Sequence, residues 1–359
     1  MSRSGVQAYA MINSRVRAMY GRMINRVTWT RLLSCGDRDA LINTLSETAY
    51  GPFLTDLLYT TLTTRRVEYE IRKHLAHDFK TIITYAPPYA QPLMKQLFRL
   101  YEVDNLKAVL RGIAINATWE RVRYMLFPMD TFPTLPYQSM VEAKSIPAAV
   151  EIIRNTPYNR TLSLAMDRYL SENSLFPIEV ALDLDYWQSV WQEVNNLPAT
   201  DREISKSMIG LIIDRINLTW AARYRIYYHL SEEEIINYTL GFGYKIDDEF
   251  IRAIASDHEL PSLVIQAYPK IVDTVSFKKT PIENLPLLEV SLQRLFMEKC
   301  KAAFIGSPFN IGVMQAYLFL LEFEVQDLIV LLEAKSLGIP SEEYEPFLVV
   351  CNQMSEEVV

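Results

Sequence analysis

The sequence has little glycine and few cysteines. Its 359 residues include 11 glycines, and neither a Walker-type loop nor a GxGxxG stretch occurs, so no glycine-rich cradle for phosphate groups is expected. The three cysteines, Cys35, Cys300 and Cys351, are far apart and lack metal-type spacing, which indicates buried or idle thiols in a reducing compartment. We therefore predict no metal site and no bound cofactor.

Positive charge is also in short supply. The formal net charge is −7, whereas nucleic-acid-binding domains are usually clearly basic. Aromatic residues are plentiful, but stacking on nucleic-acid bases would need a basic groove as well. The composition therefore argues against a nucleic-acid partner and assigns the aromatic residues to helix packing and interfaces.

A long apolar run is missing too. Residues 302–321 carry no charge, but Gly306, Ser307, Pro308 and Asn310 interrupt them. A helix that crosses a bilayer needs about 20 consecutive apolar residues, so this stretch favours a buried helix. The N-terminus lacks the uninterrupted apolar core of a secretory signal. We expect a soluble protein with no transmembrane segment of its own, which can still sit on a membrane.

What is present points to an all-α fold. Half of the residues are hydrophobic, which is ample for a core, and alternating β-type runs are few and short. Proline is poorly tolerated inside helices, so the long proline-free stretches are the places for long helices. These considerations predict helices at 8–33, 62–84, 93–127, 162–196 with a break near Pro177, 201–229, 287–304 and 309–336, with short helices between them.

A short pattern occurs three times at nearly equal intervals. It reads YEVDNLKAVLR, IDRINLTWAAR and FEVQDLIVLLE, and places Asn105, Asn217 and Asp327 at equivalent positions. The period is roughly 110 residues, a normal size for a compact domain. Internal repeats of this kind indicate one structural unit built several times. We therefore predict three tandem helical repeats of similar architecture, at residues 1–127, 128–231 and 232–359.

A second pattern follows the same period. LSETAY ends at Tyr50, IRNTPY at Tyr158 and VIQAY at Tyr268, so its intervals nearly equal those of the first pattern. Two independent patterns with one period support the triplication better than either pattern alone.

The first pattern predicts structural residues. Asn105 lies beside the apolar stripe of its helix, and a buried polar group must find a hydrogen-bond partner, which we expect in the backbone of a neighbouring short helix. Glu333 in the third copy stands where the first copy has Arg111, so the ion pairs of the third copy must differ. The structural residues predicted from the three copies are Asn105, Leu106, Arg111, Asn217, Leu218, Arg223 and Asp327.

The first predicted helix is rich in arginine, and no acidic residue occurs before Asp37. Three interpretations stay open: a solvated basic face, an organelle presequence, and an electrostatic contact with an acidic partner or with anionic headgroups. Our hypothesis is a contact with a partner protein rather than with lipid. The candidate interface residues are Arg15, Arg22 and Arg26.

No pattern identifies a catalytic site. His74 and His77 share one helical face and Asp78 is adjacent, but no cysteine or further histidine lies near. A metal site needs three or four ligands, so we predict surface histidines. Asp247 and Asp248 are typical of the start of a short helix, where acids suit the helix dipole. The pair Asp183 and Asp185 lacks the repeated spacing that holds Mg²⁺ and diphosphate in helical transferases.

The order and spacing of several stretches resemble one family over essentially the whole chain. Leaving aside 172–200, the chain resembles the C subunit, also called the d subunit, of A-type and V-type rotary ATPases. The resemblance lies in YAMINSRVRAM at 9–19, LLSCGDRDALINTLSETAY at 32–50, YEVDNLKAVLRG at 101–112 and FEVQDLIVLLEAK at 323–335.

The resemblance implies a funnel-like all-α protein with pseudo-threefold symmetry and no catalytic residues. It implies a rotor adaptor of the central stalk, peripheral on the cytoplasmic face of the membrane. Such an adaptor joins the axle, subunits D and F, to the ring of proteolipid c subunits for proton or sodium transport. The sequence alone leaves two alternatives: a helical scaffold outside any ATPase, and a helical enzyme of the isoprenoid type.

Overall fold

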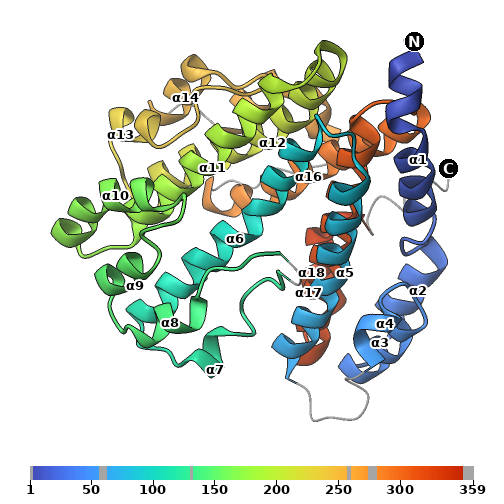
Figure 1. Cartoon of the computed structure of the whole chain (residues 1–359), viewed down its shortest axis with the longest axis horizontal. Coiled ribbons are helices and arrows are strands. Elements are labelled where there is room, and N and C mark those ends of the chain that lie inside the picture. The colour runs from blue at the N-terminus through green and yellow to red at the C-terminus, as the bar shows by residue number, and fades with distance from the viewer. Residues whose placement is uncertain (1–2, 56–62, 130–131, 257–259, 274–280, 351–359) are drawn as a thin grey trace. The chain divides into compact units, whose positions relative to one another are not determined.

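A computed structural model of the chain describes residues 3–55, 63–129, 132–256, 260–273 and 281–350 (Figure 1). Every regular element in these ranges is helical, which confirms the predicted all-α class. The helices are α1 (Arg3–Tyr20), α2 (Arg26–Ser34), α3 (Arg38–Ser46), α4 (Gly51–Leu54), α5 (Thr64–Tyr85), α6 (Gln91–Ala114), α7 (Trp119–Val122), α8 (Tyr137–Glu142), α9 (Ile146–Ile152), α10 (Asn159–Glu172), α11 (Phe176–Asn196), α12 (Ala199–Ile226), α13 (Glu232–Asn237), α14 (Asp248–Ala255), α15 (Leu260–Ala267), η2 (Pro269–Asp273), α16 (Pro281–Ile305), α17 (Gly312–Leu337), α18 (Ser341–Tyr344) and η3 (Glu345–Phe347).

The chain divides into two compact units. One unit joins Met1–Pro52, Tyr85–Pro87 and Asn196–Val359, and the other joins Phe53–Thr84 and Pro88–Asn195. The N-terminal segment therefore belongs with the last part of the chain. The division into three repeats at residues 127 and 231 stays a prediction.

The core of the first unit forms around α17. This helix contacts α1, α3, α12 and α16, and residues on all of its sides are buried over most of its length. A helix that is apolar all round is stable only inside a protein or a membrane. No helix among the described residues is both long enough and apolar enough to cross a membrane.

The core of the second unit is aromatic. Phe79 of α5 lies against Phe98 and Tyr101 of α6, with ring centroids 5.3 and 5.6 Å apart. Tyr101 in turn stacks on Phe127 at 3.9 Å. Such ring pairs add to the stability that burial of their area provides, so this cluster joins the helix pair to the segment after α7.

The prediction of one helix over residues 8–33 is wrong. The chain forms α1 and α2, and Asn25 caps α2 by accepting a hydrogen bond from Thr28 N at 3.0 Å. In the break, Ile24 N donates to the buried carboxylate of Glu324 at 2.8 Å. A distant partner thus competes with the helical hydrogen bonds, and Gly21, directly after the end of α1, was the local signal of the break.

The predicted helix at 93–127 ends early, at Ala114. Asn116 takes a left-handed conformation with φ 53°, and Ala117 N closes the turn on Gly112 O at 2.9 Å. The turn brings Val122 so close that a Cβ on Gly112 would lie 2.7 Å from it. Gly112 therefore permits α7 to fold back onto α6.

The polar helix starts were predicted in part. Asp247 caps α14, as the acidic start predicted, and accepts from Phe250 N at 3.0 Å. A capping box forms at Ser231, with Glu234 as its second member. Thr200 and Glu203 have the same spacing but form no capping box, because α12 begins at Ala199, after Pro198, without a side-chain cap.

Candidate functional site: a polar framework repeated on three long helices

The amide of Asn105 makes two buried hydrogen bonds across the second unit. Its nitrogen donates to Phe127 O at 2.9 Å, and its oxygen accepts from Phe127 N at 2.6 Å. Asn105 is 2% exposed, so both bonds lie in an apolar surrounding, where an unpaired amide would be costly. The bonds join the middle of α6 to the backbone 22 residues further on.

Asn217 of α12 repeats this arrangement. Its nitrogen donates to Leu240 O at 2.9 Å, and its oxygen accepts from Leu240 N at 2.8 Å, 23 residues further along the chain. The side chain is fully buried. In both helices the following Leu106 or Leu218 is fully buried beside the amide.

Asp327 of α17 makes a related contact with different chemistry. It accepts from Val349 N at 2.9 Å and from Val350 N at 2.7 Å, at separations of 22 and 23 residues. A carboxylate has no N–H to donate. Its second partner is therefore another backbone N–H, whereas each asparagine donates to a backbone carbonyl. This geometry explains why aspartate replaces asparagine in the third copy.

An acid lies three residues before each of these polar side chains, and it accepts a tyrosine hydroxyl. Tyr50 donates to Glu324 at 2.9 Å, Tyr158 donates to Glu102, and Tyr268 donates to Asp214. The three tyrosines end the second repeated pattern. The two patterns with one period therefore meet in space.

The separation in sequence between tyrosine and acid differs among these three bonds. Tyr158 lies 56 residues after Glu102, and Tyr268 lies 54 residues after Asp214, whereas Tyr50 lies 274 residues before Glu324. The N-terminal segment therefore supplies the tyrosine for the last long helix. This bond fits the clustering of Met1–Pro52 with the C-terminal part of the chain.

The electrostatics keep the tyrosines as donors. Burial, together with the neighbouring carboxylate, raises the pKa of Tyr158 and of Tyr268 far above the ordinary value. Both hydroxyls therefore stay protonated. Burial raises the pKa of Asp214, although the Tyr268 hydroxyl and the backbone amides of Tyr244 and Lys245 act in the opposite direction.

The arginines of the motif lie at the surface and form ion pairs. Arg111 binds Glu179 of α11 through two hydrogen bonds of 2.6 and 2.8 Å, and Arg223 binds Glu289 of α16 at 3.0 Å. The interval between the two glutamates nearly equals that between the two arginines, so the ion pair repeats with the motif. Among the described residues, no cation pairs with the exposed Glu333 of the third copy.

The family model described as ATP synthase (C/AC39) subunit matches residues 12–346. The chain belongs to this family. The A-type ATP synthase C subunit of Methanocaldococcus jannaschii is 22% identical over 345 residues, covering 95% of this chain and 86% of the relative. Its counterpart from Methanococcoides burtonii is 24% identical over 346 residues, covering 95% and 94%.

Membership in the ATP synthase (C/AC39) subunit family confirms the resemblance drawn from the sequence. Members of this family are non-catalytic stalk subunits of an ion-translocating ATPase, and we infer a structural role for the polar framework. Sequence reasoning found Asn105, Asn217 and Asp327 but missed the acids before them. The signal was the acid at the second position of YEV, IDR and FEV.

The histidine prediction is only partly right for this ATP synthase subunit. His77 is exposed, but His74 is 9% exposed and lies 3.5 Å from Asp78, which is also buried. The broad apolar face of α5 extends further round the helix than its pattern suggested. In the described ranges, no group of three or more histidine, cysteine or acidic side chains could hold a metal. Cys35 and Cys300 are free thiols, and Cys351 lies outside the described residues.

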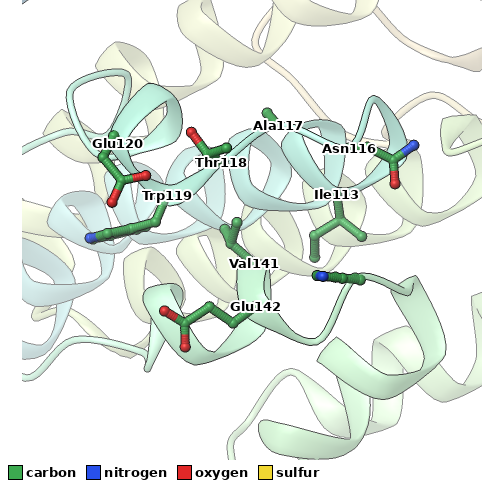
Figure 2. A pocket seen from close by; sticks show the side chains of 9 residues that line it. Ile113, Asn116, Ala117, Thr118, Trp119, Glu120, Val141 and Glu142 are labelled. Carbon is green, nitrogen blue, oxygen red and sulfur yellow. The ribbon is translucent and has the colours of Figure 1, made fainter.

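A hollow of about 450 Å³ lies where α6, α7 and α8 meet in the second unit. Figure 2 shows Trp119 and Glu120 at one end of it and Ile113 and Asn116 at the other. Its lining has no histidine or cysteine, and its ionisable side chains are Glu120, Glu142 and Lys144. The remaining lining residues are Ala117, Thr118 and Val141.

Proposed function

We propose that this subunit is the adaptor of the central stalk in an A/V-type rotary ATPase. In this proposal it joins the axle, subunits D and F, to the membrane ring of proteolipid c subunits. It lies peripherally on the cytoplasmic face and couples rotation to proton or sodium transport. The family membership supports assembly into such an ATPase.

The observation that carries the mechanical role is the repeated polar framework. An adaptor under torque must resist bending and sliding of its helices. Each of the helices α6, α12 and α17 is tied by a buried amide or carboxylate to backbone 22 or 23 residues away, and by an acid to a tyrosine hydroxyl. Buried, directional bonds of this kind fix helix register in a way that apolar contacts alone do not. Close packing adds low compressibility.

The partners are tested by capture of the tagged subunit from native membranes. We expect the axle subunits and the proteolipid to be retained together with it. Separate binding to purified D–F complex and to purified ring should each be measurable. A subunit that binds neither would be a helical scaffold with another role, and the adaptor proposal would be wrong.

A further inference from the structure

The solvent side of α1 and of the start of α2 carries an unusual charge pattern. Residues 1–36 contain six arginines, no lysine and no acid, in a chain whose net charge is −7. Arg15, Arg22 and Arg26 are exposed, and we call these three residues the arginine face.

The side of α1 opposite its exposed residues packs against other helices of the same unit. Ile12 and Val16, on the other side of α1, are at most 1% exposed, and α1 packs on α17. Tyr9 donates a buried hydrogen bond of 2.6 Å to Asp201 of α12. Arg15 therefore projects from a fixed helix, Arg22 lies in the turn that follows it, and Arg26 is the first residue of α2. A fixed support lowers the entropy cost of binding.

The guanidinium groups of the arginine face are available to bind carboxylates of a partner. The Arg15 guanidinium lies over the Tyr85 ring at 4.0 Å, which orients it and leaves its N–H edges open. No carboxylate among the described residues pairs with Arg15, Arg22 or Arg26. Neighbouring Arg17 and Arg31 differ, because Arg17 donates to Phe304 O at 2.9 Å and Arg31 binds Glu47 at 2.8 Å.

The exposed side of α1 carries small side chains. Ala10, Ser14 and Ala18 are exposed and follow one another at spacings of four residues, so they lie along one side of α1, and the exposed Gly21 comes directly after its end. Small side chains in such a row let a second helix approach closely. Met11, which is 61% exposed, adds apolar area at the edge.

We propose that the arginine face docks an acidic helix of another subunit of the same ATPase. This inference rests on the proposed function. Arginine forks match carboxylates with two parallel hydrogen bonds, and complementary charge fixes both partner and register. A helix fits the trough of small residues. An anionic membrane is the poorer occupant, because it offers no helix to fill the trough of small side chains.

The test reverses the arginine face in the full-length tagged subunit. The variant Arg15→Glu, Arg22→Glu, Arg26→Glu is captured from native membranes and washed at increasing salt, and the co-purifying ATPase subunits are quantified by mass spectrometry. The matched control reverses three exposed arginines of the second unit: Arg65→Glu, Arg121→Glu, Arg160→Glu. All substituted side chains are exposed, so circular dichroism should show equal helix content.

We expect about tenfold weaker retention of one partner subunit for the reversed arginine face, with the control like wild type. The salt dependence of retention should also fall. Equal retention of wild type and both variants at every salt concentration would overturn the inference and leave the adaptor proposal standing. If the wild-type chain retains no ATPase subunit, the adaptor proposal itself fails.

Two further measurements separate the possible occupants. A cross-linker attached through Ala18→Cys should label a helix with net negative charge, and labelling of a basic or neutral segment would contradict the proposal. Flotation with phosphatidylglycerol vesicles tests lipid directly. Flotation of wild type that the arginine-face reversal abolishes would assign this surface to headgroups instead.

Discussion

The substitution Asn105→Asp tests the polar framework with the smallest possible change. The new carboxylate can still accept from Phe127 N, but its second oxygen faces Phe127 O, to which Asn105 now donates at 2.9 Å. One hydrogen bond is lost, about 1 kcal/mol, and a buried charge faces a carbonyl at a further cost of about 2 kcal/mol. The loss of unfolding free energy should therefore be about 3 kcal/mol.

Calorimetry at pH 7 should show the transition of the second unit lowered by about 6–12 °C. Burial beside a carbonyl raises the pKa of an aspartate, so the penalty is complete above that raised pKa. The penalty disappears as the pH falls toward the pKa of this aspartate in the unfolded chain, because the protonated acid can donate to Phe127 O again. The loss should thus shrink on acidification.

Asn155→Asp is the control, because it makes the same chemical change at an exposed position of the second unit. It should alter the transition little at any pH. The reciprocal variant Asp327→Asn should cost about 1.5–3 kcal/mol, because an amide nitrogen would face one of two backbone N–H groups. Full stability of Asn105→Asp at pH 7, or a loss independent of pH, would refute this reasoning.

The same contacts lead to three further predictions. Tyr50→Phe should cost about 1.5–3 kcal/mol and reduce hydrogen-exchange protection in α2, α3 and α17, and unchanged protection there would contradict the contact with Glu324. Gly112→Ala should cost about 1–3 kcal/mol in denaturant unfolding, since its Cβ would lie 2.7 Å from Val122, whereas an unaltered midpoint would rule out that close approach. For Asp214 the folded pKa is raised, so wild-type stability relative to Asp214→Asn should fall as the pH rises from 3.8 through that raised pKa, and a pH-independent difference would count against it.

The helices themselves could largely be read from the sequence, because proline positions and the apolar period mark them. Their breaks could be read only in part. The break before Asn25 depends on Glu324, 300 residues away from Ile24, and the early end of α6 depends on the close contact of Gly112 with Val122. Both are tertiary effects that override local propensity.

The candidate site shows the same limit. The periodic patterns identified Asn105, Asn217 and Asp327, since a polar residue beside an apolar stripe stands out. They did not pair Tyr50 with Glu324, because that bond joins the two ends of the chain. The burial of His74 was not predicted either, because the apolar period of a helix does not show how wide its buried face is.

The most direct measurement of the adaptor role is the coupling of ATP hydrolysis to ion pumping in vesicles that contain the complete ATPase. Without this subunit, we expect hydrolysis by the catalytic subunits to continue while ATP-driven ion uptake stops, and re-addition of the purified chain to restore uptake. Ion uptake that persists at the wild-type ratio to hydrolysis in the absence of the chain would contradict the account.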